Sequence, residues 1–430
     1  MKTIIVCGGG YAGISFLRNF PDKKNFRIIL IDRNPFHYLQ PEVYGYIAHE
    51  SLISDILIDL ISLSAGISKD ILFIKDKIIS IDFDNNQVVM KNGRLKYDYL
   101  VFALGGKTFF PPIKGLREYS AGVKTIERSM DFKQSFEKVL LKKFKNETEC
   151  SIDKNNDFNI VVGGGGLSGV EIASEMAFFQ REIFKNSRCL INNTNIILIE
   201  ALPSILAGLD PFIIENAYKR LKNLGVNIIT GKKIVAVDKD KVVLEDGKEI
   251  KSDFLIWTGG LEGSSVIKRL ENVKVNRRNQ LIVDKFFRIR ENVFAIGDSA
   301  EIRDFDTNEV LPPTAQIAIQ SGKIVAKHIY DLETKKTMYP EYPKFKGIIS
   351  ALGGKYAVGM VGNIRIKGYL AYLLKQAVLK SYKLPLKYLS YKGYKEINGK
   401  WLRWLSSIRW YLLKSSPSGL NIFLNFQIIY

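Results

Sequence analysis

Two glycine-rich segments have the spacing of loops that bind phosphate. The first follows the apolar run 3–7 and places glycines at Gly8, Gly10 and Gly13. In such a GxGxxG turn, the first glycine allows a tight turn and the second lets the backbone approach a pyrophosphate. The third lets the helix pack on the strand, and the helix N-terminus attracts the anion. The segment predicts a dinucleotide-binding loop; an ordinary glycine-rich turn is the alternative.

An acidic residue ends the next predicted strand. The run 28–31 is apolar and is followed by Asp32, which comes 19 residues after Gly13. A carboxylate at this point can accept hydrogen bonds from both ribose hydroxyls of a dinucleotide. The segment 1–32 therefore reads as a strand, a helix and a second parallel strand.

A second unit repeats this pattern. It begins near Asn159, has its glycines at Gly164, Gly166 and Gly169, and ends at Glu200, 31 residues after the last glycine. The longer interval predicts a longer helix or an insertion around 185–194. Glu200 would repel a 2′-phosphate, which favours NADH over NADPH. A solvated strand end without a ligand is the alternative.

Two such units in one chain indicate two dinucleotides. A chain that holds FAD and NAD(P)H side by side is most simply an oxidoreductase that passes hydride from nicotinamide to flavin. Other apolar runs predict further elements, with a polar linker over 144–158 and a helix from Thr314 to about Asp331. The predicted strands lie near 71–74, 78–83, 87–90, 99–103 and 293–296.

Length and composition set the frame for these motifs. The 430 residues predict two or three domains, and 46% hydrophobic with 25% charged residues is typical of a globular protein. Cys7, Cys150 and Cys189 form no CxxC pair, which argues against a disulfide scaffold, a zinc ribbon and a dithiol site. No signal peptide is evident, so a reducing cytoplasm is expected. No stretch approaches 18 uncharged apolar residues.

The C-terminal fifth of the chain is distinct in charge. Residues 355–430 hold thirteen Lys or Arg against one acid, a net charge of +12, whereas the first 354 residues carry +7. Three of the four tryptophans also lie there. Two amphipathic basic segments, near 366–382 and 399–414, predict helices that lie flat in a membrane interface. Nucleic-acid binding, and packing against the protein's own core or a dimer partner, are the alternatives.

Together these motifs resemble the two-dinucleotide-fold flavoproteins, and one segment narrows the resemblance. Residues 312–322, PPTAQIAIQSG, look like the quinone-site helix of type II NADH:quinone oxidoreductases, and 31–41 also look like that family. The remaining motifs that carry the resemblance are 8–13, 164–171, 257–260 and 294–298.

The resemblance implies an α/β fold with two Rossmann-like domains, the NADH domain inserted in the FAD domain, and a C-terminal membrane-binding region. The implied ranges are 1–118 and 263–354 for FAD, 119–262 for NADH, and 355–430 for the membrane. It implies FAD and NADH as cofactors and a membrane quinone and lipids as partners, at the cytoplasmic face. No metal is expected, and no nucleic acid, because no nucleic-acid motif is recognised; no proton pumping is expected, because the sequence has no charged transmembrane pathway. A homodimer stays open.

The resemblance also implies roles for single residues. Glu171, in the first turn of its helix, would lie between nicotinamide and flavin, and Gln316 and Gln320 would face the quinone. A surface location of the two glutamines is the alternative, and an acid is favoured near a helix N-terminus in any case. The implied NADH-side residues are Gly164, Gly166, Gly169, Glu200 and Gly260. The implied FAD-site residues are Gly8, Gly10, Tyr11, Ala12, Gly13, Asp32, Arg33, Ile78, Ala103, Gly105, Gly297, Asp298, Ala315 and Gln316.

Three rival functions use the same motifs. A sulfide:quinone oxidoreductase needs cysteines beside the flavin, and none of the three occupies an obvious redox position. A reductase of a small acidic carrier would suit the basic surface but would not need the interfacial tryptophans. A flavoprotein without enzymatic activity could use the tail to bind nucleic acid. Glu42 departs from the family pattern, in which an apolar residue is expected after Pro41.

Overall fold

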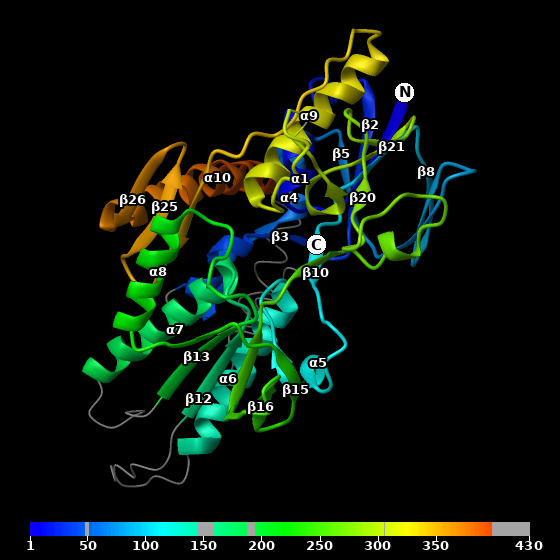
Figure 1. Ribbon diagram of the computed structural model, residues 1–430. Helices are drawn as coiled ribbons and strands as arrows, with labels where there is room; N and C mark the ends of the chain where they lie inside the picture. The colour runs from blue at the N-terminus through cyan, green and yellow to red at the C-terminus, as the bar shows by residue number, and fades with distance from the viewer. Residues whose placement is uncertain (48–50, 145–157, 187–193, 305, 398–430) are drawn as a thin grey trace, which may run out of the picture.

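A six-stranded sheet forms the centre of the first dinucleotide-binding unit (Figure 1). The computed structural model describes residues 1–47, 51–144, 158–186, 194–304 and 306–397. All neighbouring strands of this sheet are parallel except the edge pair β21–β22. In spatial order the strands are β21 (Arg288–Arg290), β22 (Val293–Ala295), β9 (Tyr99–Phe102), β1 (Lys2–Cys7), β2 (Phe26–Asp32) and β5 (Ile71–Lys75).

The central strand of this sheet is apolar on both faces because both faces are covered. Ile4, Ile5 and Val6 of β1 are fully buried, as expected for a parallel strand in the interior of an α/β unit. Helix α1 (Tyr11–Asn19) packs against α9 (Ala315–Glu333) at very short range. A Cβ on Gly322 would come within 2.3 Å of the Ala12 carbonyl oxygen, so this contact needs a glycine.

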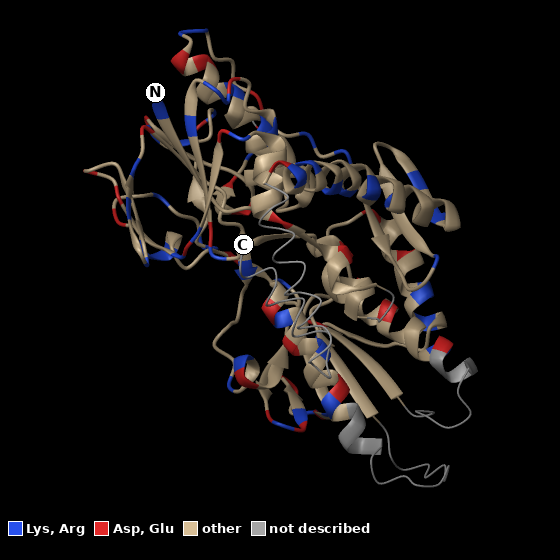
Figure 2. Ribbon diagram, turned by 180° about the vertical axis from the view of Figure 1, so that it is seen from behind, with Lys and Arg blue, Asp and Glu red and all other residues tan. Residues whose placement is uncertain are grey.

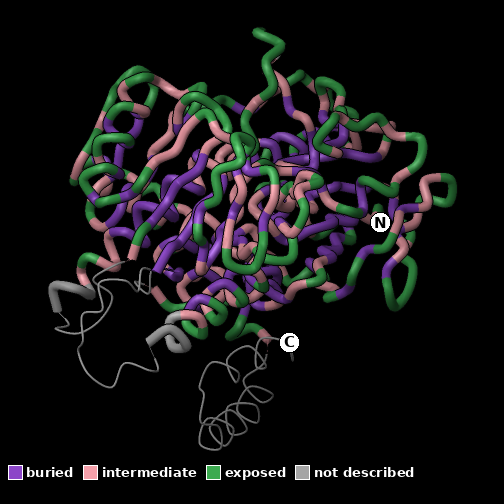
Figure 3. Tube along the Cα trace, turned by 60° about the horizontal axis from the view of Figure 1, so that its bottom comes forward, coloured by how far each residue is buried: buried purple, intermediate pink, exposed green. Residues whose placement is uncertain are grey.

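A five-stranded parallel sheet forms the second unit, which is inserted between β9 and β22 of the first. Its longer glycine-to-acid interval comes mainly from α7 (Leu167–Asn186), which has 20 residues against nine in α1. In spatial order its strands are β11 (Ser120–Ala121), β18 (Phe254–Trp257), β12 (Phe158–Gly163), β13 (Thr194–Glu200) and β14 (Asn227–Thr230). Buried residues run through the interior of the molecule and exposed residues lie at its periphery (Figure 3).

The chain passes between the two units through a short antiparallel ribbon. Strands β10 (Gly106–Thr108) and β19 (Leu261–Gly263) pair there. Asp210 caps α8 (Pro211–Asn223), with Pro211 at its first position, and Thr314 caps α9. The other helices are α2 (Val43–Ile47), α3 (Ile53–Ile56), α4 (Leu60–Ile67), α5 (Leu116–Tyr119) and α6 (Ile126–Phe144). The smaller strands are β3 (Phe36–Tyr38), β4 (Leu57–Asp59), β6 (Ile78–Asp82), β7 (Gln87–Met90), β8 (Gly93–Lys96), β15 (Ile234–Val237), β16 (Lys241–Leu244), β17 (Glu249–Lys251), β20 (Leu281–Ile282) and β23 (Ala300–Glu301).

A three-stranded sheet and a long helix complete the described chain. Strands β24 (Gly347–Ala351), β25 (Ala357–Val361) and β26 (Ile364–Gly368) lead into α10 (Tyr369–Glu396), which packs on α4. Within the described ranges, no helix combines the length and the apolar character needed to cross a bilayer.

The predicted α/β fold with two dinucleotide-binding units is confirmed, as are the expected strands and the helix after Thr314. The predicted linker over 144–158 and the second basic segment near 399–414, with its three tryptophans, lie almost entirely outside the described residues.

Candidate functional site

The first glycine loop is shaped partly by the protein and partly for a ligand. Gly8 has φ +116°, and a Cβ there would come within 2.3 Å of the Ala103 carbonyl oxygen. A Cβ on Gly13 would come within 2.0 Å of the Gly8 carbonyl oxygen. A Cβ on Gly10, in contrast, would meet no protein atom within 4 Å, and Gly10 lines a cavity. The middle glycine therefore leaves room for something outside the fold, as a pyrophosphate requires.

The carboxylate at the end of β2 closes this loop. Asp32 accepts hydrogen bonds from the Gly9 amide at 2.7 Å and from the Asn34 amide at 2.8 Å. Burial raises the pKa of Asp32, while these two amides favour its charged form and oppose the shift. Arg33 follows it on the cavity wall. An acid fixed at this position can receive ribose hydroxyls.

The second glycine loop repeats this geometry closely. Gly164 has φ +106°, and a Cβ on Gly169 would come within 1.8 Å of the Gly164 carbonyl oxygen. A Cβ on Gly166 would meet nothing within 4 Å, and Gly166 also lines the cavity. Glu200 accepts from the Gly165 amide at 2.5 Å and from the Leu202 amide at 2.8 Å. Both predicted loops are therefore formed, and in each a backbone amide of the loop donates to the carboxylate at the end of the next strand.

One cavity of about 1000 Å³ joins the two loops. Its wall contains most of the predicted residues, from both units and from α9. The exceptions are Gly13, Gly164, Gly169, Glu200 and Gln320. The predicted residues on the wall are Gly8, Gly10, Tyr11, Ala12, Asp32, Arg33, Ile78, Ala103, Gly105, Gly166, Glu171, Gly260, Gly297, Asp298, Ala315 and Gln316.

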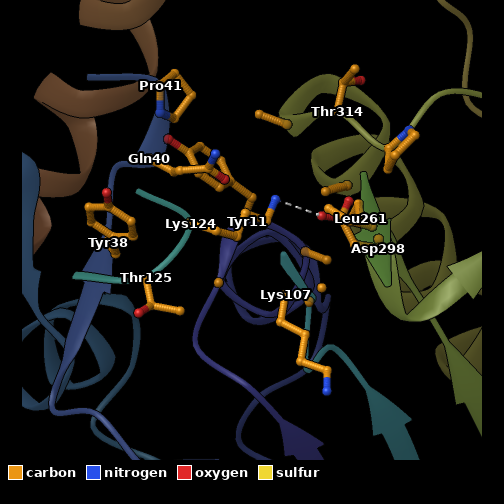
Figure 4. Close-up of a pocket in the computed structure, with 18 of the residues that line it drawn as sticks. Tyr11, Tyr38, Gln40, Pro41, Lys107, Lys124, Thr125, Leu261, Asp298 and Thr314 are labelled. Atoms are coloured by element: carbon orange, nitrogen blue, oxygen red, sulfur yellow. Dashed lines mark hydrogen bonds and ion pairs between the residues drawn. The ribbon is translucent and has the colours of Figure 1, made fainter. Parts of the chain in front are cut away.

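Asp298 is paired with a cation that the sequence motifs do not reveal. Lys124 Nζ lies 3.3 Å from the Asp298 carboxylate across the cavity (Figure 4). Figure 4 also shows Tyr11, Tyr38, Gln40 and Lys107 arranged around the same space. Lys124 stands in a loop 174 residues from its partner, so no spacing rule could connect them.

Glu171 lies at the junction between the second unit and the C-terminal elements. Its carboxylate accepts from the Ala351 amide of β24 at 2.9 Å and pairs with Lys375 of α10. Both partners are largely buried, with 8% of the Glu171 and 11% of the Lys375 side chain exposed. The expected location in the first helical turn is wrong, because α7 begins at Leu167 and Glu171 is its fifth residue. Packing against β24 and α10, rather than the helix dipole, therefore determines its surroundings.

The two glutamines of α9 bind the backbone of residues 344–347, at the start of β24. The Gln316 amide donates to the Gly347 carbonyl at 2.9 Å and accepts from the Lys346 amide at 2.9 Å. Gln320 donates to the carbonyls of Lys344 and Gln316, at 2.9 and 3.1 Å, and accepts from the Lys344 amide at 3.0 Å. A primary amide has two N–H donors. Gln320 thus uses both, whereas Gln316 has one left and faces the cavity.

Helix α10 buries Ala371, Leu386 and Gly393, and three of its lysines reach acids of the protein body. Lys383 pairs with Glu42, and Lys387 Nζ lies 3.7 Å from the Asp55 carboxylate. A helix lying in a membrane interface would turn its cations towards lipid head groups; Lys375 and Lys383 instead pair with acids of the protein body. Glu42, which departs from the family pattern, is explained by this pairing. The row of basic residues along α10 is visible in Figure 2.

The apolar outer face of α10 lies beside one end of the cavity. Val378 and Leu379 of α10 line this end together with Ile348 and Val361 of the three-stranded sheet. The exposed apolar and aromatic residues of the helix are Tyr369, Leu370, Leu373, Leu374, Val378, Leu384, Tyr388, Tyr391 and Tyr394. The cavity therefore reaches the surface next to an apolar patch.

No cysteine of the described chain lines the cavity. Cys7 is buried in β1, and burial raises the pKa of its thiol well above the usual range. Cys150 and Cys189 lie outside the described residues. Within the described ranges, no group of three or more His, Cys, Asp or Glu could hold a metal ion.

Comparison with known proteins places the chain among flavoprotein-type reductases. The profile of the pyridine nucleotide-disulphide oxidoreductases matches residues 2–322. The type II NADH:quinone oxidoreductase of Haemophilus influenzae is 27% identical over 399 residues, covering 84% of this chain and 88% of that protein. The enzyme of the same name from Staphylococcus aureus MSSA476 is 28% identical, covering 88% and 94%.

Solved structures share the fold. NDH2 from Plasmodium falciparum, in complex with NADH, has a TM-score of 0.78 at 19% identity, with 92% of this chain and 98% of that one covered. The sulfide:quinone oxidoreductase of Aquifex aeolicus has a TM-score of 0.74 at 20% identity, with 90% and 92% covered. The predicted resemblance to type II NADH:quinone oxidoreductases, and the enzyme class that it implies, are confirmed.

Proposed function

The chain belongs to the pyridine nucleotide-disulphide oxidoreductase family, and from this premise we propose that it is a membrane-surface NADH:quinone oxidoreductase that uses FAD. One observation carries the proposal: a single cavity is lined by both glycine loops and opens beside an apolar patch. When bound, FAD supplies the redox chemistry by accepting hydride from NADH and passing two electrons to a quinone.

The first unit is the FAD site of this proposal. The space beside Gly10 admits a pyrophosphate, Asp32 is fixed to receive the ribose, and Asp298 faces the same cavity at the N-terminal side of α9. By the same argument, the second unit is the NADH site. Gly166 leaves the corresponding space, and the carboxylate of Glu200 disfavours a 2′-phosphate.

The quinone site of the proposal lies where α9, β24 and α10 meet. Gln316 is the stronger candidate of the two glutamines, because its remaining N–H can donate to a quinone carbonyl without a permanent charge. Gln320 then acts through the segment that it holds in place. We expect Gln316→Ala to slow quinone reduction about tenfold while sparing flavin reduction by NADH. Equal slowing of both steps in stopped-flow measurements would remove Gln316 from the quinone site.

The outer face of α10 is the membrane-binding surface of the proposal, on the cytoplasmic side. Exposed Leu370, Leu374 and Val378 would enter the lipid interface beside the cavity opening. Replacing these three residues by Ser should lower the fraction that floats with anionic vesicles, and an unchanged fraction would contradict this assignment. The proposed reaction takes place at the membrane surface and includes no proton path through the bilayer, so it would not pump protons.

The decisive experiment is anaerobic bleaching of the flavin absorbance with NADH, NADPH and sulfide as separate reductants. Fast bleaching by NADH, reversed by a short-chain quinone, is the expected result. Bleaching by sulfide but not by NADH would instead favour the sulfide:quinone oxidoreductase alternative, for which a solved structure of similar fold exists.

A further inference from the structure

The carbonyl of Gly9, in the first glycine loop, is held by side chains that lead to the C-terminal helix. His37 Nδ1 lies 2.9 Å from the Gly9 carbonyl oxygen, and the Tyr382 hydroxyl lies 3.1 Å from His37 Nε2. A carbonyl can only accept, so Nδ1 carries the ring proton and Nε2 accepts from Tyr382. Burial lowers the pKa of the fully buried His37 to about 4, which keeps the ring neutral near pH 7.

The same tyrosine packs directly on the loop. Its ring stacks on Tyr11 with centroids 4.8 Å apart and 26° between the planes. His37 meets Tyr11 edge-on at 4.9 Å. Tyr11 follows Gly10 and lines the cavity. Tyr382 therefore contacts the loop by stacking and, through His37, by hydrogen bonding.

A second set of contacts joins α10 to Gly9 through α4. A Cβ on Gly9 would lie 2.6 Å from Leu60 Cδ1 of α4. Helices α4 and α10 cross at Gly66 and Gly393, where a Cβ on either glycine would come within 1.8 Å of a backbone oxygen of the other helix. The backbones of the two helices are thus in direct contact, and α10 cannot shift without disturbing α4.

We propose that His37 and Tyr382 are positioning residues of the first glycine loop, and that docking of α10 sets the affinity of the protein for FAD. The inference rests on the proposed function only in placing FAD at this loop. A phosphate-binding loop acts through backbone amides held in advance in one conformation, and loosening its carbonyl contact reduces that preorganisation. The helix that carries the proposed membrane face is then also a structural part of the cofactor site.

The test is a titration of the full-length apoprotein with FAD, followed by flavin fluorescence. Tyr382→Phe removes only the hydroxyl and leaves His37 Nε2 buried without its donor. We expect it to weaken FAD binding about tenfold. The matched control is Tyr388→Phe on the same helix, where the side chain is 68% exposed; its affinity should stay within about twofold.

Two further variants separate positioning from general stability. Gly393→Leu forces α10 away from α4 without touching His37 or Tyr382, and it should weaken FAD binding while leaving NADH affinity unchanged. The double variant His37→Phe/Tyr382→Phe should bind FAD no more weakly than His37→Phe alone, because one connection has already been broken.

The outcomes separate this inference from the proposed function. Equal FAD affinity in wild type, Tyr382→Phe and Gly393→Leu overturns the positioning role, and so do fully additive effects in the double variant. A wild-type chain that takes up no FAD would overturn the proposed function itself, and this inference with it.

Discussion

The two glycine loops have nearly the same geometry but are stabilised over very different sequence distances. In both, the residue after the first glycine of the motif donates its amide to the acid at the end of the next strand, as Gly9 does to Asp32 and Gly165 to Glu200. The carbonyl of Gly165 accepts from the backbone amide of Leu206 at 2.8 Å. The carbonyl of Gly9 instead accepts from the His37 side chain.

One loop is therefore held by its own unit, whereas the other needs side chains from elsewhere in the chain. A backbone amide is supplied by every residue except proline, so the contact to Gly165 survives most substitutions of Leu206. The contact to Gly9 needs an imidazole, which in turn meets a tyrosine 345 residues further along the chain. The first loop therefore depends on a distant helix, and the second depends on its own unit.

The largest expected effects come from filling the space beside each middle glycine. Gly166→Val should keep the normal flavin content but slow flavin bleaching by NADH about 100-fold or more, equivalent to about 2.7 kcal/mol. Gly10→Val should abolish flavin retention itself. A Cβ at either position meets no protein atom within 4 Å, so the flavin-free form of neither variant should lose thermal stability. Loss of flavin in Gly166→Val would show that the two loops are not separate sites.

The next effect concerns the ion pair that joins the second unit to α10. Lys375→Met leaves the Glu171 carboxylate buried without its partner and should lower the free energy of unfolding by about 3 kcal/mol. The double variant Glu171→Gln/Lys375→Met should recover most of that loss, because no buried charge remains. Thermal denaturation of these two variants and of wild type measures the loss and its recovery. A double variant as unstable as the single would mean that packing, and not charge, holds this junction.

Acid should weaken the first loop before the second. The folded pKa of His37 is about 4, below its usual value of 6.5, so the folded state resists protonation. Its contribution to stability is complete above pH 6.5 and declines as pH falls from 6.5 towards 4. The total loss is about 3 kcal/mol.

Flavin release and thermal denaturation between pH 7 and 4.5 test this expectation. His37→Gln should flatten part of the pH dependence. Burial also lowers the pKa of His328, which acts in the same direction and should leave a residual slope. If stability and flavin retention depended on pH in His37→Gln as steeply as in wild type, His37 would not be the cause of the acid sensitivity.

Sequence reasoning found what local patterns encode and missed what the fold brings together. Glycine spacing, strand-end acids and the cap of α9 are local signals, and Gly8, Asp32 and Thr314 lie where they were expected. Lys124 has no local signal, because its partner Asp298 belongs to another unit. Lys375 was visible as one cation of an amphipathic helix, but only tertiary packing decides that it faces Glu171 rather than lipid.

The smallest expected effect concerns the acids that follow the two glycine loops, Asp32 and Glu200. Both acids are partly exposed, but Asp32 lines the cavity and Glu200 does not. Glu200→Gln combined with Ala201→Arg should therefore shift the ratio of NADPH to NADH use about tenfold, because screening by solvent limits the charge effect. Glu200→Gln alone keeps a hydrogen-bonding group at this position and should produce a smaller part of the shift. The kcat/KM values for the two nucleotides measure the ratio, and flavin content is the control because the first loop is untouched. An unchanged ratio would remove Glu200 from the ribose site. The second loop would then bind the pyrophosphate without selecting between the two nucleotides.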